Sequence, residues 1–184
     1  SPPTSLAIQI TSSTLKAAVN VIALGSIGSS ISSLTVQSST IYGDRMWNFA
    51  TITTASFIQS EAYLTTAFGQ TFNGVFNTIS VQNSNLTGSA LNGARSQLLY
   101  TTAQTVTGTA LTIQSSNFYN FVLGKAVAGA NTVEIRTTTI ADSTFNTFKN
   151  AFGGFVSSNG NMSLSIARST FTGTLDGDAL ITAG

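Results

Sequence analysis

The sequence predicts an all-β fold, a single-stranded parallel β-helix (β-solenoid) of about seven coils. Three observations support this prediction. A short motif recurs seven times along the chain, at intervals of 22 to 32 residues. Apolar and polar residues alternate within the motif, which is typical of a half-buried strand. The alternation breaks once in each copy, which requires a corner. A unit of strand and corner cannot bury its apolar side alone, so successive copies are expected to stack as coils.

The first copy, Ile8 to Leu15, shows the pattern apolar–x–Ile/Val–x–x–Ser–x–apolar. Ile8 and Ile10 point inward with a period of two, and the next inward residue, Leu15, follows five positions later. An odd interval cannot place both residues on the same side of one continuous strand. The chain must therefore turn at or beside Ser13, whose hydroxyl can bond backbone groups that the bend leaves unpaired.

Aligning the seven copies on the corner residue predicts columns of equivalent residues. The corner column forms a structural ladder of Ser13, Ser39, Glu61, Ser84, Ser116, Ser143 and Ser169. One inward column is Ile10, Val36, Ile58, Val81, Ile113, Ile140 and Ile166. The next is Leu15, Ile41, Tyr63, Leu86, Phe118, Phe145 and Phe171, so stacked rings are expected at the C-terminal end of the core. The third copy has the least defined register, because Ser56 and Glu61 depart from the pattern.

Two outward features follow from the same alignment. Four glutamines, Gln37, Gln59, Gln82 and Gln114, are expected in line, where their amides could bond along the ladder. Asp142 and Arg168 precede the corner serines of adjacent coils, which predicts an exposed ion pair between those coils.

The rest of each coil is less regular. Apolar clusters are expected to form a third strand at residues 21–24, 47–52, 75–76, 98–100, 133–135 and 152–156. The longest interval predicts a projecting loop between Gly88 and Thr107, which includes Arg95. At 184 residues the chain has room for one core, so residues 1–184 are expected to form a single β-solenoid domain. The absence of an initiator Met and of a signal peptide favours a mature or excised part of a longer chain.

Composition excludes several classes of protein. The chain has no Cys and no His, which rules out a disulfide scaffold, a Cys/His zinc site and a His-based catalytic triad. Charged residues make up 7% and the net charge is +1, which argues against nucleic-acid binding. No apolar run approaches the roughly 18 residues of a membrane-spanning helix. We expect no cofactor, and the polar uncharged bias favours an extracellular or cell-surface location.

The corner sequences resemble a known group of repeats. The segments that carry the resemblance are residues 116–120 (Ser-Asn-Phe-Tyr-Asn), 143–146 (Ser-Thr-Phe-Asn), 169–173 (Ser-Thr-Phe-Thr-Gly) and 152–156 (Phe-Gly-Gly-Phe-Val). They are similar to right-handed parallel β-helix repeats of the pectate-lyase-like superfamily, and to chlamydial-type polymorphic outer-membrane proteins and autotransporter passengers. The resemblance implies a right-handed coil, and the members of the group range in function from lyases to adhesins. The Phe-x-x-Asn half of the family repeat is not cleanly reproduced.

The carboxylates do not predict a catalytic site. Glycoside hydrolysis needs carboxylates that converge on one face. Asp142 is assigned to Arg168, Asp44 to a turn and Glu61 to an outward corner, while Asp176 and Asp178 fit a solvated turn better than a weak Ca²⁺ site. The remaining carboxylate, Glu134, has no predicted partner. The sequence therefore favours a non-enzyme over a polysaccharide lyase or hydrolase.

We expect a structural role, as a segment or subunit of a shaft, filament or adhesin that self-associates end to end or continues into the same chain. The first alternative is a carbohydrate-binding or polysaccharide-active β-helix with its active site outside this segment. Aromatic candidates for contacts with surface glycans are Trp47, Tyr42, Tyr100 and Tyr119. A weaker alternative is ice binding by threonines at 51–53, 105–107 and 137–139, which do not recur at one position of every coil. Asn85 and Asn161 begin glycosylation sequons.

Overall fold

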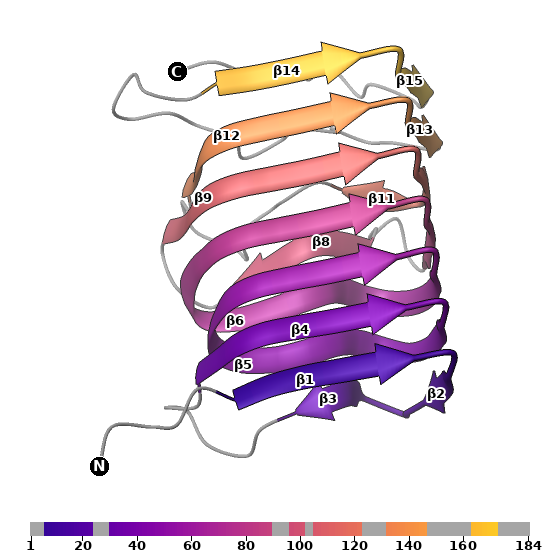
Figure 1. Cartoon of the computed structure of the whole chain (residues 1–184), viewed down its shortest axis with the longest axis vertical. Helices are drawn as coiled ribbons and strands as arrows, with labels where there is room; N and C mark the ends of the chain where they lie inside the picture. Colours follow the sequence, from indigo (N-terminus) through magenta and orange to yellow (C-terminus); the bar gives the residue numbers. More distant parts are fainter. Residues whose placement is uncertain are drawn as a thin grey trace.

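The computed structural model describes residues 6–23, 30–89, 96–101, 105–122, 132–146 and 163–172. All regular elements in these ranges are β-strands, and every pairing between them is parallel. About seven coils stack along the long axis of the molecule, with β1 at one end and β14 at the other (Figure 1). The predicted all-β parallel solenoid is confirmed.

The long sheet faces the viewer in Figure 1. It contains β1 (Leu6–Thr11), β4 (Ser30–Gln37), the C-terminal parts of β5 (Thr40–Ile58) and β6 (Glu61–Gln82), β9 (Thr105–Gln114), β12 (Thr132–Ala141) and β14 (Ser163–Ala167).

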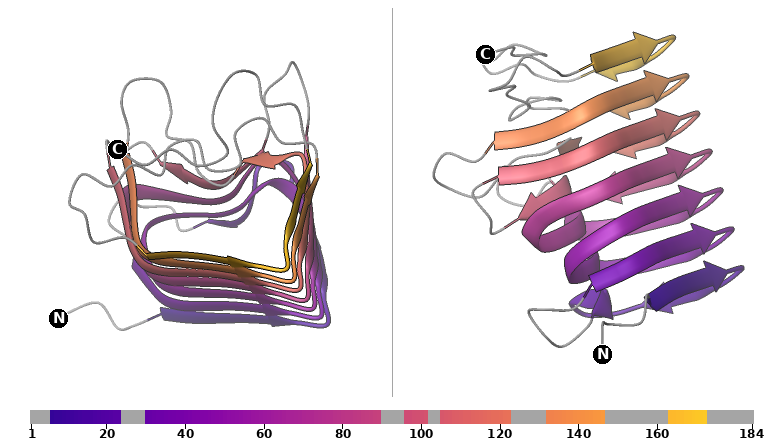
Figure 2. Two further views of the ribbon diagram at one scale, coloured as in Figure 1. Left: turned by 90° about the horizontal axis from the view of Figure 1, so that it is seen from above. Right: turned by 60° about the vertical axis from the view of Figure 1, so that its left-hand side comes forward.

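The short sheet follows directly after the corner of each coil. It contains β2 (Thr14–Lys16), the N-terminal parts of β5 and β6, β7 (Asn85–Gly88), β10 (Asn117–Tyr119), β13 (Thr144–Asn146) and β15 (Thr170–Thr172). A third side is formed by β3 (Asn20–Ala23), the middle of β5 and β6, β8 (Ser96–Thr101) and β11 (Phe121–Val122). Seen along the axis, the sides enclose the core (Figure 2).

The corner between the two sheets has the same backbone in all seven coils. The residue before the corner serine has a left-handed conformation, with φ between 47° and 52°: Ser12, Ser38, Gln59, Asn83, Ser115, Asp142 and Arg168. This conformation is uncommon for a residue with a Cβ. It reverses the phase of the side chains, which explains the odd interval between the inward residues on either side of the corner.

The corner serines form a continuous hydrogen-bonded ladder. The Ser13 N–H donates to the Ser39 hydroxyl oxygen at 3.1 Å, and the Ser39 hydroxyl donates to the Gln37 carbonyl at 2.8 Å. The same N–H to hydroxyl bond links Ser84 to Ser116 and Ser116 to Ser143, each at 3.2 Å. The inner corner serines are nearly fully buried. The hydroxyl therefore supplies a partner to a backbone N–H that the left-handed turn removes from the strand ladder.

The register predicted for the third coil is wrong by one residue. Ser60, not Glu61, occupies the corner ladder, because the Ser39 N–H donates to the Ser60 hydroxyl and the Ser60 N–H donates to that of Ser84. Phe57, not Ile58, stands between Val36 and Val81 in the inward column. In the observed register Phe57 is buried in the core and Ser60 is buried in the ladder. The predicted register would instead place Ile58 in the core and Glu61 in the ladder.

Two further expectations fail for the same reason. Ala62, not Tyr63, lies inward between Ile41 and Leu86. Ile58 interrupts the predicted glutamine column between Gln37 and Gln82, while Gln59 occupies the left-handed corner. The corner serines are therefore separated by 26, 21, 24, 32, 27 and 26 residues.

Stacked columns fill the core. Phe118 lies 4.8 Å from Phe145 with the rings 12° apart, and Phe145 lies 4.6 Å from Phe171 at 4°, which confirms the predicted aromatic stack. Glycine makes room where a large ring lies against the next coil. A Cβ on Gly69 would come within 2.1 Å of the Trp47 ring.

Of the predicted third-strand clusters, residues 21–23, 47–49 and 98–100 lie on the third side, as predicted. Residues 51–52, 75–76 and 133–135 belong instead to strands of the long sheet, so the prediction is wrong for them. Residues 152–156 and residue 24 lie outside the described ranges. The projecting loop predicted between Gly88 and Thr107 is wrong in part, because β8 lies in the middle of it and pairs with β6 and β11. Arg95 lies outside the described residues.

Candidate functional site

Two outer surfaces of the solenoid carry regular columns of side chains. We call them the long-sheet surface and the short-sheet surface. On the long sheet, the side chains at positions 33, 35 and 37 and their equivalents in other coils point outward, because the intervening Leu34 and Val36 are buried. On the short sheet, the two residues flanking the buried Ile41 and its equivalents point outward. The strict alternation of each strand therefore defines both surfaces.

The long-sheet surface has three columns. The first is Ala7, Ser33, Thr54, Thr78, Ala110, Thr137 and Ser163. The second is Gln9, Thr35, Ser56, Ser80, Thr112, Thr139 and Ser165. The third is Thr11, Gln37, Ile58, Gln82, Gln114, Ala141 and Ala167. All these side chains are at least partly exposed, and no position in the three columns holds a charged or aromatic residue.

The short-sheet surface has two columns. One contains Thr14, Thr40, Glu61, Asn85, Asn117, Thr144 and Thr170. The other contains Lys16, Tyr42, Tyr63, Thr87, Tyr119, Asn146 and Thr172. This surface differs from the long-sheet surface because it combines aromatic rings, amides and charges.

The aromatic column begins with a three-membered stack. The rings of Tyr42 and Tyr63 are 4.9 Å apart and 8° from parallel. The Lys16 ammonium lies 4.9 Å from the centroid of the Tyr42 ring, within the range of a cation–π contact. Tyr42, Tyr63 and Tyr119 are 37%, 40% and 49% exposed. Thr87 separates the stack from Tyr119 by one coil.

Polar contacts link the neighbouring column to these rings. The Tyr63 hydroxyl donates to a Glu61 carboxylate oxygen at 3.2 Å. The negative charge of Glu61 and this hydrogen bond raise the pKa of Tyr63 above its ordinary value. The Asn117 amide of one coil donates to the Asn85 amide oxygen of the adjacent coil at 2.9 Å. The short-sheet surface thus presents amides and a carboxylate beside exposed rings.

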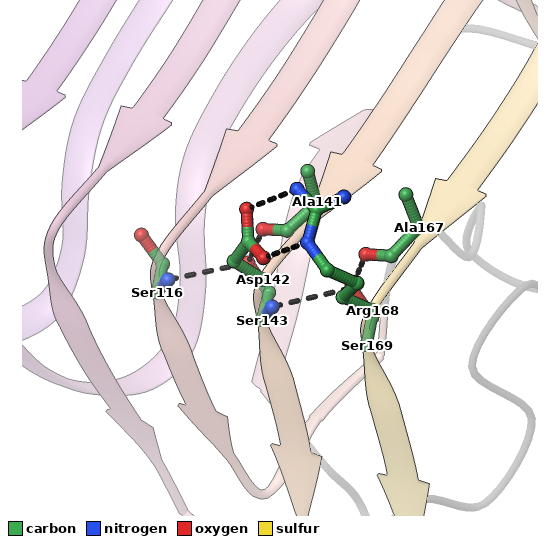
Figure 3. A network of polar contacts seen from close by, with 7 residues as sticks. All are labelled: Ser116, Ala141, Asp142, Ser143, Ala167, Arg168 and Ser169. Atoms are coloured by element: carbon green, nitrogen blue, oxygen red, sulfur yellow. Dashed lines mark hydrogen bonds and ion pairs between the residues drawn. The ribbon is translucent and has the colours of Figure 1, made fainter.

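The predicted ion pair is present at the corner. The Arg168 guanidinium donates to both carboxylate oxygens of Asp142, at 2.5 and 2.8 Å, beside the ladder of Ser116, Ser143 and Ser169 (Figure 3). The hydrogen bond from Arg168 lowers the pKa of Asp142 below its ordinary value, and the Asp142 carboxylate raises the pKa of Arg168. Both side chains occupy left-handed corner positions, so the corner geometry points them toward each other.

The aromatic candidates from the sequence separate into three groups. Tyr42 and Tyr119 lie on the short-sheet surface, as a glycan contact would require. Trp47 is fully buried in the core, so a glycan-binding role for it is wrong. The side chain of Tyr100 lies outside what the structure describes. Tyr63 was missed, because the predicted register of the third coil pointed it inward.

The carboxylates that the structure describes do not converge. Asp44 accepts hydrogen bonds from the hydroxyls of Thr65, at 2.6 Å, and of Thr66, and lies 3.6 Å from the Arg45 guanidinium. Glu61 lies on the short-sheet surface, and Asp142 lies at a corner. Asp176 and Asp178 and the side chain of Glu134 are outside the described part of the chain. Within that part, no three His, Cys, Asp or Glu side chains gather as metal ligands would.

Two remaining sequence predictions concern modification and membranes. Asn85 is exposed on β7, whereas Asn161 falls outside the described residues. The described ranges contain no helix of the length and hydrophobicity needed to cross a bilayer.

Comparison of the chain with protein-family models, curated proteins and solved structures gives no match.

Proposed function

We propose that this chain is a structural β-solenoid of an extracellular or cell-surface protein, which extends by stacking a further solenoid on its ends. The stacked partner is another copy of the chain or further coils of the same polypeptide. The supporting observation is a contrast between the inner and the end coils. Inward side chains of the inner coils, such as Leu34 and Ile113, are almost fully buried, whereas Leu6 and Leu164 in the end coils are 41% and 40% exposed.

The corner ladder supports the same proposal, because its two described ends are complementary. At one end the Ser13 hydroxyl donates to the Thr11 carbonyl, and its oxygen has the position that accepts an N–H in every following coil. At the other end the Ser169 N–H has the position that donates to the next serine. A head-to-tail contact between copies would therefore continue both the ladder and the core. A contact of this heterologous type propagates into a filament.

The experiment is measurement of particle mass against concentration by light scattering, together with electron microscopy of the purified chain. We expect rods whose length rises with concentration. Leu164→Glu places a charge in the open core at one end and should shift the population to single units. Thr109→Glu adds the same charge at an exposed position of an inner coil and should leave the rods intact. Single units at every concentration, or an equal effect of both variants, would refute stacking between copies of the chain and leave further coils of the same polypeptide as the stacked partner.

We infer further that the coil belongs to the right-handed, pectate-lyase-like type and that this segment is not itself an enzyme. The corner sequences beginning at Ser116, Ser143 and Ser169 support the first inference, and the dispersed carboxylates of the described residues support the second. Incubation with pectin and other acidic polysaccharides is the test of the second inference. Release of unsaturated or reducing ends by the purified chain would contradict it.

Glycan binding at the short-sheet surface is the second candidate, favoured by the exposed Tyr42 and Tyr63 rings beside Glu61 and Asn85. Apolar sugar faces pack on aromatic rings, while amides and carboxylates bond to sugar hydroxyls. Affinity electrophoresis in gels that contain polysaccharide measures such binding. A retardation that Tyr63→Ala abolishes, and that Ser56→Ala on the long-sheet surface does not, would support a glycan site. Equal mobility with and without every polysaccharide tried would exclude it.

A further inference from the structure

The long-sheet surface has a hydroxyl pattern that repeats in two dimensions. In its first two columns, all but three positions hold Ser or Thr, and the exceptions are Ala7, Gln9 and Ala110. The repeated unit is a pair such as Thr54 and Ser56, whose side chains lie on either side of a buried Ala55. The pair recurs as Ser33 with Thr35, Thr78 with Ser80, Thr137 with Thr139 and Ser163 with Ser165.

The parallel strands determine the dimensions of this pattern. Side chains two residues apart on one strand are separated by roughly 6.6 Å, and equivalent side chains on neighbouring coils by roughly 4.8 Å. The array covers the flat side of the solenoid formed by β1, β4, the ends of β5 and β6, β9, β12 and β14, whose strands overlie one another closely when viewed along the axis (Figure 2). The outward side chains of these two columns therefore form a two-dimensional array rather than a single row, and we call this array the lattice.

The lattice is held rigidly from below. Five of the inward side chains beneath it, those of Leu34, Ile79, Val81, Leu111 and Ile113, are at most 1% exposed. The backbone is hydrogen-bonded to a neighbour on both sides in every inner coil. β-branched Thr side chains also have few rotamers, so their hydroxyl and methyl groups keep a fixed orientation.

The chemistry of the surface limits what it can bind. The three columns contain no charge and no aromatic ring, so they offer little to an ionic ligand or to the apolar face of a sugar. Each hydroxyl provides one donor and two acceptor lone pairs, which match the bonding of a water molecule. A peptide or a single glycan chain repeats in one dimension only. A ligand that repeats in two dimensions at the spacing of hydroxyls is a crystal face.

We propose that the long-sheet surface binds ice, with the paired columns of Ser and Thr as the contact lattice. Hydroxyl groups at fixed spacing order the first layer of water, and methyl groups of the threonines leave neighbouring waters free to bond to one another. The proposal does not depend on end-to-end stacking, because the surface runs along the side of the solenoid. The three threonine segments predicted from the sequence do not form this lattice as a set. Thr51 and Thr107 belong to another column, and only Thr137 and Thr139 lie in it.

The test is thermal hysteresis and crystal shape in a droplet assay, together with incorporation of the fluorescently labelled chain into a growing ice hemisphere. The unmodified chain should show a gap between melting and freezing, faceted crystals and a labelled hemisphere. Thr78→Tyr and, separately, Thr139→Lys place a bulky or charged group in the lattice. Each should abolish the hysteresis and the incorporation while the far-ultraviolet circular dichroism is unchanged.

The matched control is Thr87→Tyr. It makes the same substitution in the short-sheet aromatic column, between Tyr63 and Tyr119, and should keep full activity toward ice. No hysteresis and no incorporation of the folded unmodified chain would overturn the proposal. Loss of activity in Thr87→Tyr with retention in Thr78→Tyr and Thr139→Lys would also overturn it. Binding of the chain to crystalline cellulose without binding to ice would assign the lattice to a polysaccharide surface instead.

Discussion

At the scale of single residues, the corner serine decides where each coil turns. Its hydroxyl accepts an N–H from the preceding coil and donates to the carbonyl two residues before it, so one side chain satisfies two backbone groups. The left-handed residue that precedes it varies from Ser to Gln, Asn, Asp and Arg. The turn is therefore specified by the serine and by the neighbouring coils more than by the residue with positive φ.

Removing one corner hydroxyl should have a measurable cost. In Ser84→Ala the Ser60 N–H, which now donates to the Ser84 hydroxyl at 3.1 Å, is left unpaired in a buried turn. We expect the free energy of unfolding to fall by about 1–3 kcal/mol. Urea denaturation measures the change. Ser56→Ala, on the long-sheet surface, is the control and should change stability by less than about 0.5 kcal/mol. Equal effects of the two variants would argue against a structural role for the ladder.

A buried hydroxyl in the sixth coil, that of Thr138, is expected to lower the stability of the fold, whereas the corner serine hydroxyls raise it. Thr138 stands in the inward column between Leu111 and Leu164, and its side-chain oxygen has no hydrogen-bond partner. Thr138→Val keeps the shape of the side chain and removes the unsatisfied hydroxyl. We expect it to stabilise the fold by about 1 kcal/mol or more, measured by urea denaturation. A loss of stability would show that the hydroxyl is satisfied in solution.

The corner ion pair gives a pH dependence of known sign. The pKa of Asp142 is lowered below its ordinary value of 3.8 in the folded chain, chiefly by the hydrogen bond from Arg168. The stabilisation by the Asp142–Arg168 pair is therefore complete above the pKa that Asp142 has in the unfolded chain. It is lost as the pH falls through the lower pKa that Asp142 has in the folded chain. The urea midpoint of the unmodified chain should exceed that of Asp142→Asn by a small margin at neutral pH, and the two should converge in acid. A margin that is independent of pH would contradict this assignment.

At the scale of strands and their packing, large rings in one coil lie against small residues in the next. Gly69 pairs with Trp47 across the coils, and a Cβ at Gly69 would overlap the indole ring. Gly69→Ala should destabilise the fold by about 1–3 kcal/mol through overpacking. Trp47→Phe in the same chain supplies a smaller ring and should recover part of the loss, so a double-mutant cycle measures the coupling. Additive effects would show that the two residues do not contact each other.

At the scale of the whole molecule, the solenoid is a stack in which each coil contacts only its neighbours. Inner strands such as β6 and β9 pair on both sides, whereas β1 and β14 each pair with one described strand. Backbone amides of β6 and β9 should therefore exchange with solvent more slowly than those of β1 and β14, as measured by hydrogen exchange. Protection of β1 and β14 that rises with protein concentration would support end-to-end stacking. Uniform protection at all concentrations would contradict the nearest-neighbour description.

The repeat, the corner and the parallel coil could all be predicted from the sequence alone. This was possible because the period-two pattern, the odd interval and the serine at the turn are all local features, visible without knowing which residues touch. The Asp142–Arg168 pair and the aromatic stack of Phe118, Phe145 and Phe171 followed directly from that alignment. The hand of the coil stays an expectation from the resemblance.

The register of the third coil and the composition of the two surfaces depend on contacts between coils. A serine stands at residue 60 and a glutamate at 61, and the local pattern tolerates either as the corner. Burial of Phe57 and the serine ladder select Ser60, because both depend on coils before and after. That shift of one residue turns Tyr63 outward and aligns Thr54 and Ser56 with the hydroxyl columns. Side chains from different coils meet only after every register is set, so neither surface could be recognised from one repeat at a time.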